Sequence, residues 1–511
     1  MKRAWFRELL GRRIAVILLL VLQALFIAYV VSSDSPVVEL TRILLRVLSV
    51  AIVLHVISKK DKGANKVAWV FLILLFPVFG GAFYLLYHFQ SSTKRFSNAI
   101  SEIEQKSRDL YRLPGDAYER AERAIPQNLP QIRYLQEFAG YPVFDTTNTR
   151  YFSPGEQLLE PLLNELKKAR KYIFLEYFIV EEGIVWNSIL AVLKEKAMQG
   201  VDVRLIYDDI GCFLTLPRKY NEELAKYGIK CVTFNPFRPV LSVVQNNRDH
   251  RKITSIDGKV AFTGGINLAD EYANIVEKHG YWKDSAIMVE GKGAWSLTLM
   301  FLEMWHLCTS QEERLEDFYP WKEEVCSIPD DGFVQPYADS PMDDENVGEH
   351  VYMQILNHAR NYVYITTPYL IVDDSMVSAL CLAAKSGVDV RIITPHIWDK
   401  ALIHMTTRSY YRELIRGGVK IYEYSKGFIH SKTFVSDDQT ATVGTTNLDF
   451  RSLYLHFECG VWINGSRTVS QVKEDFLNTL KDCQQISLDA CKGNPFTRLL
   501  QDLLRLVAPL L

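Results

Sequence analysis

Residues 249–258 read Asp-His-Arg-Lys-Ile-Thr-Ser-Ile-Asp-Gly, and they place His250, Lys252 and Asp257 at relative positions 0, +2 and +7. Residues two apart on a β-strand share a face, so His250 and Lys252 are expected to project together. Asp257 has the opposite parity and precedes Gly258, and Asp-Gly between two apolar strands is a strong hairpin signal. We therefore predict that the histidine and the lysine form a reactive face and that Asp257 fixes the turn.

The same pattern occurs again at His430, Lys432 and Asp437, with the same three relative positions. An asparagine stands 17 residues after each histidine, Asn267 in the first copy and Asn447 in the second. A single histidine of this kind is usually structural, but repetition of the whole set indicates a duplicated catalytic half. The candidate catalytic residues are His250, Lys252, Asp257, His430, Lys432 and Asp437.

The two asparagines follow short runs of small residues, Gly264-Gly265-Ile266 before Asn267 and Gly444-Thr445-Thr446 before Asn447. Glycine lets a phosphate approach the backbone closely, and an asparagine amide donates hydrogen bonds. We predict that Asn267 and Asn447 bind phosphate.

The duplication extends to the secondary structure. Residues 157–207 alternate between helical spacing of apolar side chains and continuous apolar runs that are typical of buried strands. Residues 358–365 and 386–391 resemble residues 168–175 and 199–204. Such alternation predicts an α/β fold with mainly parallel sheets covered by helices.

Two acidic residues are candidates to orient the histidines. Asp284 precedes an apolar segment downstream of the first motif, and Glu458 follows His430 by 28 residues. An imidazole in nucleophilic or acid-base catalysis needs a carboxylate that fixes its tautomer. We therefore pair Asp284 with His250 and Glu458 with His430; a solvated surface charge is the alternative for Asp284.

The composition of the 511-residue chain limits its functions. Hydrophobic residues make up 48% and charged residues 23%, which is typical of an ordered protein with a sizeable core. The formal net charge of -2 gives no global cationic field, which argues against a nucleic-acid partner. The eight cysteines are scattered and indicate neither a zinc site nor a disulfide framework. We expect no metal and no cofactor.

The amino-terminal 90 residues predict a membrane region. A basic amino terminus precedes the apolar run 14–31, which predicts a membrane helix, with a cleaved signal peptide as the alternative. Two further apolar segments, 38–57 and 67–89, are interrupted by charged residues and by a proline with two glycines, respectively. The basic loop 59–66 is expected in the cytoplasm.

We predict a multi-pass protein of the cell membrane, with its catalytic domain at the membrane surface. Three full spans would export that domain, whereas the unpaired cysteines favour the cytoplasm, so both sides stay open. The expected organisation is a membrane anchor (1–90), a linker (91–131), a first half (132–310), a seam (311–346), a second half (347–494) and an amphipathic helix (495–511).

Two histidines with two lysines favour phosphodiester chemistry by double displacement. One imidazole attacks phosphorus, the other protonates the leaving alkoxide, and the lysines hold the nonbridging oxygens. A second alcohol or water then attacks the covalent phosphohistidine. The choice of acceptor in that step decides between a synthase and a hydrolase.

At these residues the chain resembles the phospholipase D superfamily, whose HxKxxxxD motif occurs twice and builds one site between two pseudo-twofold-related α/β/α halves. The closer resemblance is to bacterial-type cardiolipin synthases. It covers nearly the whole chain, including NNRDHRKITSIDGKVAFTGGINLADEY, YWKDSAIMVEG, SKGFIHSK and GTTNLDFRSLYLHFECG. Thr446 and Cys459-Gly460 depart from the family pattern and bear on substrate choice.

The resemblance implies that two phosphatidylglycerol molecules yield cardiolipin and glycerol without a metal. It implies that His250 attacks phosphorus and that His430 acts first as acid and then as base, with the reverse assignment open. A hydrolytic phospholipase D or another phosphatidyltransferase is the alternative enzyme. A nuclease of the same fold and a noncatalytic membrane scaffold are less favoured alternatives.

Overall fold

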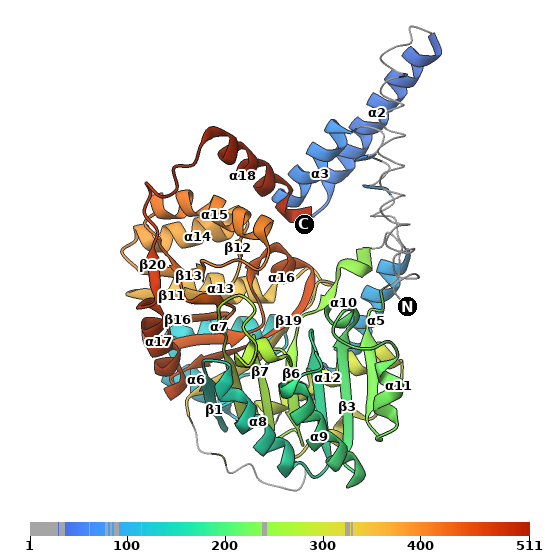
Figure 1. The fold of residues 1–511 in the computed structure, drawn as a ribbon, viewed down its shortest axis with the longest axis vertical. Coiled ribbons are helices and arrows are strands. Elements are labelled where there is room, and N and C mark those ends of the chain that lie inside the picture. Colours follow the sequence, from blue (N-terminus) through green and yellow to red (C-terminus); the bar gives the residue numbers. More distant parts are fainter. Residues whose placement is uncertain are drawn as a thin grey trace. The chain divides into compact units, whose positions relative to one another are not determined.

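The computed structural model describes residues 29, 36–60, 62–76, 80–81, 84–85, 91–113, 115–237, 243–321, 328 and 331–510. The chain forms two compact units. One comprises Met1–Phe96, Phe237–Asn246 and Asp502–Leu511, and the other, which we call the catalytic unit, comprises Ser97–Pro236 and Asn247–Gln501. Figure 1 shows the fold of both units.

Two apolar helices form the centre of the first unit, α2 (Pro36–Ser58) and α3 (Gly63–Leu75). They pack through a small cluster of buried side chains that includes Val56, Trp69 and Ile73. The predicted span 38–57 lies within α2, and the predicted span 67–89 begins within α3. The predicted span 14–31 lies outside the described residues apart from Tyr29. Among the helices that the structure describes, none combines the length and the apolar character needed to cross a membrane.

The catalytic unit contains two large sheets with the same strand order. The first sheet runs β1 (Thr147–Phe152), β9 (Ala286–Gly291), β7 (Val260–Gly264), β6 (Lys252–Ile256), β2 (Tyr172–Tyr177), β3 (Asp202–Asp208), β4 (Lys230–Phe234). The second runs β10 (Phe333–Asp339), β19 (His456–Asn464), β17 (Thr440–Gly444), β16 (Thr433–Ser436), β11 (Tyr362–Thr366), β13 (Asp389–Pro395), β14 (Lys420–Tyr424), β20 (Cys483–Gln485). Apart from β20, each position in one sheet has its counterpart in the other, so the repeated sequence builds a repeated topology.

The prediction of mainly parallel sheets is wrong, although the α/β class is confirmed. In each sheet the parallel pairs are β2–β3 and β3–β4, or β11–β13 and β13–β14. The pairs from β2 through β6, β7 and β9 to β1 are antiparallel. The motif contributes to this difference. The tight turn at Asp257-Gly258 connects β6 directly to β7, and so short a connection can join only antiparallel strands.

Helices cover the sheets on the outside, and the two halves share a core between them. In the first half α8 (Glu156–Lys168) and α9 (Ile184–Met198) contribute Leu162 and Ile189 to a cluster with strand residues of the first sheet. A second cluster combines strands of both halves, including Val289 and Val461. The helices α12 (Ala294–Thr309) and α17 (Arg467–Leu480) also contribute to this second cluster. The halves are therefore one packed body.

Two short strands cross between the halves. The strand β5 (Arg248–Asp249) belongs to the first half by sequence, but it pairs in parallel with β19 of the second half, where Asp249 faces Phe457. In return, β15 (Gly427–Ile429) pairs with β8 (Tyr281–Lys283) of the first half. Each histidine follows one of these two strands, so this exchange positions the site.

Candidate active site

Each motif histidine is anchored by the half to which it does not belong in sequence. The backbone N–H of His250 donates to the carbonyl of Phe457 at 2.9 Å, and the N–H of His430 donates to the carbonyl of Lys283 at 2.7 Å. These bonds continue the two crossing strand pairs by one residue. Both histidines are buried, together with Lys252 and Lys432.

The carboxylates follow the same crossing. Nδ1 of His250 lies 2.9 and 3.0 Å from the two carboxylate oxygens of Glu458. Nδ1 of His430 lies 2.7 Å from Oδ2 of Asp284. The predicted pairs, Asp284 with His250 and Glu458 with His430, are therefore wrong. The physical reason is that β5 and β15 have exchanged halves, so the carboxylate of each half meets the histidine of the other.

The pKa values of the carboxyl groups differ between these two dyads. Burial alone raises the pKa of a carboxyl, but the charges of His430 and Lys432 outweigh it at Asp284 and lower that pKa below its usual range. At Glu458 burial prevails and raises the pKa well above its usual value, although Lys252 and the hydroxyl of Thr445 oppose the shift. The two histidines therefore sit in unlike environments.

The histidines are held as neutral imidazoles. Burial, followed by the charges of Lys252 and His456, lowers the pKa of His250 well below its usual value. Burial and the charge of Lys432 lower the pKa of His430 to about 4, although Asp284 opposes this shift. A neutral imidazole whose Nδ1–H donates to a carboxylate has a free lone pair on Nε2, which is what a nucleophile requires.

The lysines lie close to the histidines, although each histidine lies between two strands and not within one, as the parity argument had assumed. The ammonium group of Lys252 donates to the carbonyl oxygen of His250 at 2.6 Å, and that of Lys432 donates to the carbonyl of His430. Burial lowers the pKa of Lys252 to about 8 and that of Lys432 to about 7. Two buried ammonium groups in one site favour an anionic ligand.

Asp257 and Asp437 lie in the turns that parity and the Asp-Gly signal predicted for the first copy. Asp257 has φ of 52°, and its carboxylate accepts the backbone N–H groups of residues 170, 171 and 172 at 2.8 Å each. Asp437 has φ of 54° and accepts those of residues 360, 361 and 362 at 2.7 to 2.9 Å. These carboxylates tie each hairpin to the start of the neighbouring strand. Asp257 and Asp437 were predicted among the catalytic residues, but their carboxylates bond to backbone N–H groups and not to the imidazoles.

The asparagines hold local structure around the site. Asn267 accepts the N–H of Ile179 at 3.0 Å and donates from Nδ2 to the hydroxyl of Tyr272 at 2.8 Å. Asn447 donates from Nδ2 to the hydroxyl of Ser452 at 3.0 Å. Each amide nitrogen carries two protons, so these bonds leave capacity for one more acceptor.

Sequence reasoning missed His456. Its Nδ1 is buried without a hydrogen-bond partner and lies 3.8 Å from Oε1 of Glu458, while its ring centroid is 5.6 Å from that of His250. Two positions before Glu458 on the same strand, it shares the face of that carboxylate, and this spacing was the available signal. Among the described residues, His250, His456 and Glu458 are the one group of side chains close enough to hold a metal ion. An ion there would replace the bond between His250 and Glu458.

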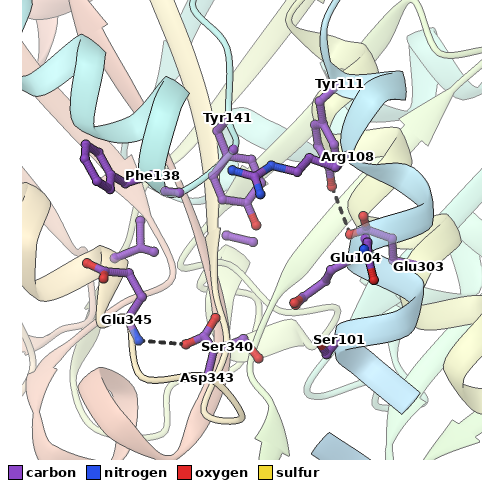
Figure 2. A pocket seen from close by; sticks show the side chains of 15 residues that line it. Ser101, Glu104, Arg108, Tyr111, Phe138, Tyr141, Glu303, Ser340, Asp343 and Glu345 are labelled. Carbon is purple, nitrogen blue, oxygen red and sulfur yellow. Dashed lines mark hydrogen bonds between the residues drawn. The ribbon is translucent and has the colours of Figure 1, made fainter. Parts of the chain in front are cut away.

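A cavity of about 350 Å³ lies elsewhere in the catalytic unit (Figure 2). It is lined by residues of α5 (Ser91–Tyr111), α12 and the segment after β10, with Glu104, Glu303 and Asp343 among them. Burial and the charges of the other two acids raise the pKa of Glu104 to about 8. Neither motif histidine lines this cavity, so the pair of histidines remains the candidate phosphate site.

Comparisons with known proteins identify the family of the chain. A family model described as "Cardiolipin synthase, PLD-like domain" matches residues 162–285 and 352–480. Another, described as "Phospholipase_D-nuclease N-terminal", matches residues 47–87. His250 and Lys252 lie within the first matched range, and His430 and Lys432 lie within the second.

Relatives match over most of their length. The cardiolipin synthase of Alkalihalophilus pseudofirmus is 35% identical over 471 residues, covering 91% of this chain and 92% of that protein. An uncharacterised protein of Streptococcus mutans is 43% identical over 470 residues, covering 90% and 99%. The crystal structure of phosphatidylserine synthase from Haemophilus influenzae has a TM-score of 0.54 at 15% identity, covering 72% of this chain and 95% of that one, which shows the fold alone. The chain belongs to the cardiolipin synthase family with PLD-like domains.

Proposed function

We propose that the protein transfers a phosphatidyl group between two phosphatidylglycerol molecules and forms cardiolipin and glycerol. The observation that carries this proposal is the pair of crossed dyads, His250 with Glu458 and His430 with Asp284, beside two buried lysines. A reaction with two successive displacements at one phosphorus needs a nucleophile and a separate acid. The site offers one imidazole for each task.

The first displacement uses the free Nε2 of His250. It attacks phosphorus of the first phosphatidylglycerol, the bond from phosphorus to the glycerol oxygen breaks, and His430 gives that oxygen a proton. Glycerol leaves, and a phosphatidyl group is bound to His250. In the second displacement His430 takes the proton of a glycerol hydroxyl on the second phosphatidylglycerol, and the resulting oxygen attacks phosphorus. Cardiolipin leaves, and His250 is regenerated.

The unlike carboxylates support this assignment of roles. Asp284 has a lowered pKa and stays ionised, so it stabilises the imidazolium form of His430 that an acid requires. The low pKa of His430, about 4, is that of the unliganded site. An anionic phosphodiester between the two imidazoles raises it, because a nearby negative charge favours the protonated form. Glu458 needs only to hold Nδ1–H of His250, which keeps Nε2 free.

The remaining polar groups are assigned to the phosphate. Lys252 and Lys432 neutralise its nonbridging oxygens, and more strongly so as negative charge develops in the transition state. We assign to the same phosphate the second amide protons of Asn267 and Asn447, which the bonds to Tyr272 and Ser452 leave free. We assign no metal and no other cofactor to either step.

We also propose that the first unit holds the protein in the cell membrane. Large apolar side chains on α2 and α3 are exposed, among them Leu44, Val47, Leu54 and Leu74. Exposed apolar surface of this extent on two neighbouring helices is typical of a surface that lipid or another protein covers. The basic residues before position 14 and at 59–66 favour a cytoplasmic amino terminus. The cytoplasmic side is favoured for the catalytic unit.

A product assay tests the proposed function. Purified full-length protein with phosphatidylglycerol as its sole phospholipid is expected to release glycerol and cardiolipin in equal amounts. Release of phosphatidic acid without cardiolipin would support the hydrolytic alternative, a phospholipase D. His250→Ala and His430→Ala are the matched inactive controls, and activity retained in both would remove the site from the reaction.

A further inference from the structure

Two loops of the catalytic unit expose large apolar side chains, and a chain of contacts links each loop to one of the two histidines. The first follows β3 and contains α10 (Asp209–Cys212), where Phe213 and Leu214 are 39% and 83% exposed. The second follows β13 and leads into α15 (Ala401–Arg416), where Trp398 and Leu402 are 51% and 57% exposed. Because β3 and β13 occupy the same position in the two sheets, the loops are counterparts in the repeat.

The first loop reaches His250 through one residue. Cys212 contacts Phe178, whose carbonyl lies 3.6 Å from its sulfur, and the ring of Phe178 is 5.1 Å from the imidazole of His250. The strand β3 that precedes this loop is also tied to the motif, because Arg248 forms a buried ion pair with Asp208 at 2.8 Å. Leu214 follows Cys212 by two residues in this loop.

Two residues, Tyr369 and Phe428, link the second loop to His430. Asp399 accepts the hydroxyl of Tyr369 at 2.6 Å, and the ring of Tyr369 is 6.4 Å from that of Phe428. Phe428 belongs to β15 and its ring is 6.0 Å from the imidazole of His430. Trp398 precedes Asp399 directly in this loop.

Exposed cations accompany both apolar groups. Arg218 and Lys219 follow the first loop, and Lys400 and Arg412 belong to the second loop and its helix; all four are exposed. Tryptophan and leucine beside basic side chains suit the boundary between acyl chains and anionic headgroups. A soluble partner would not explain why the same chemistry occurs twice, once in each half.

We propose that these two loops form a rim that docks the catalytic site onto a surface of anionic phospholipid. This inference rests on the proposed function, because phosphatidylglycerol is both the substrate and an anionic lipid. Leu214 and Trp398 enter the acyl boundary, one from each half, while the four cations contact headgroups. Docking brings the headgroup to the histidines without drawing the whole lipid from the bilayer.

The test compares two physical forms of one substrate with the full-length protein. The double variant Leu214→Ser/Trp398→Ser is assayed on bilayers of long-chain phosphatidylglycerol and on a short-chain phosphatidylglycerol below its micellar concentration. The rate on bilayers is expected to fall at least tenfold, while the rate on the soluble substrate stays within twofold. Met198→Ser, 79% exposed at the carboxyl end of α9, is the matched control and is expected to leave both rates unchanged.

A binding measurement tests the proposal that the rim docks on lipid independently of the proposed function. Phosphatidylglycerol with brominated acyl chains is expected to quench a component of tryptophan emission that is absent in Trp398→Phe. Equal losses on both substrates, or no quenching of this component, would overturn the lipid-docking rim and favour a protein partner. If phosphatidic acid or no product forms, the quenching result still decides the rim, so the two proposals fail separately.

Discussion

His430 and Asp284 lie 146 positions apart in sequence and in different halves, yet Nδ1 and Oδ2 are 2.7 Å apart. The counterpart bond joins His250 and Glu458 across the same boundary, 208 positions apart. Neither half contains a complete dyad. The site therefore requires both halves in the packed arrangement that β5 and β15 produce.

The crossed pairing predicts that substitutions of Asp284 and of Glu458 have different effects when the leaving group of the substrate is changed. Asp284→Asn removes the charge that stabilises the imidazolium of His430, and turnover of phosphatidylglycerol is expected to fall by about 10²–10⁴. With a p-nitrophenyl leaving group, which needs no proton, formation of the covalent intermediate should be nearly normal in this variant. Rapid-quench kinetics of p-nitrophenol release make the measurement.

Glu458→Gln is the matched variant for the other dyad. It disturbs the nucleophile His250, so formation of the covalent intermediate should slow with both substrates, seen as slower release of p-nitrophenol from the activated one and of glycerol from phosphatidylglycerol. If Asp284→Asn slows the activated substrate while Glu458→Gln spares it, His430 is the nucleophile and the proposed roles of the two histidines are reversed.

The lowered lysine pKa values predict an alkaline limit to activity. A lowered pKa means that the ammonium loses its charge at a lower pH, so Lys432 is charged below about 7 and neutral above it. Because the charged form binds phosphate, the affinity for a phosphodiester substrate should fall by up to about tenfold per pH unit above that point. Lys432→Arg keeps its charge throughout and should move the limit to about 8, the pKa of Lys252. An unchanged pH profile in Lys432→Arg would show that another group sets the limit.

The turn aspartates are expected to affect stability rather than chemistry. Asp257→Ala leaves three backbone N–H groups without their carboxylate acceptor, which should lower the free energy of unfolding by about 2–4 kcal/mol. Asp438→Ala is the control, because that carboxylate is 62% exposed and its pair with Lys473 is a surface one. Denaturant unfolding in detergent measures both. A loss of kcat in Asp257→Ala at unchanged stability would show that Asp257 takes part in the reaction.

Gly265 leaves room for the carboxylate of Asp284. A Cβ at this position would overlap that carboxylate, whereas its counterpart Thr445 donates a hydrogen bond to Glu458. Gly265→Ala is expected to displace Asp284 and lower kcat by about 10² or more, since misplacement of a catalytic group by about 1 Å has that effect. The control is Gly493→Ala, where the nearest atom would be 3.7 Å away and activity should not change. Full activity in Gly265→Ala would mean that Asp284 need not hold its position.

The sequence was sufficient for those features that local rules decide. The Asp-Gly signal predicted the turn at Asp257, which the structure shows with a positive φ. The repeat of spacings predicted two equivalent halves, and the two sheets have the same strand order. Each of these inferences depends on residues within about ten positions of one another or on direct self-similarity.

The partner of each histidine could not be found in this way. Proximity along the chain led us to pair Asp284 with His250. In the fold β5 and β15 each pair with a strand of the opposite half, and no local sequence pattern encodes that exchange. The prediction of mainly parallel sheets was wrong for a related reason, because the alternation of helices and strands covers only β2, β3 and β4 in the first repeat and β11, β13 and β14 in the second. His456 was missed because a lone histidine two residues before an acid has no motif of its own.

Trapping the covalent intermediate tests the central claim most directly. In His430→Ala, a phosphatidyl donor with a p-nitrophenyl leaving group should still react with His250, because that group needs no acid. The adduct should then accumulate, because the base for the second step is missing. Mass spectrometry of the digested protein is expected to find the phosphatidyl group on His250, and p-nitrophenol to equal the adduct in amount. An adduct on another residue, or p-nitrophenol released without any adduct, would contradict the account.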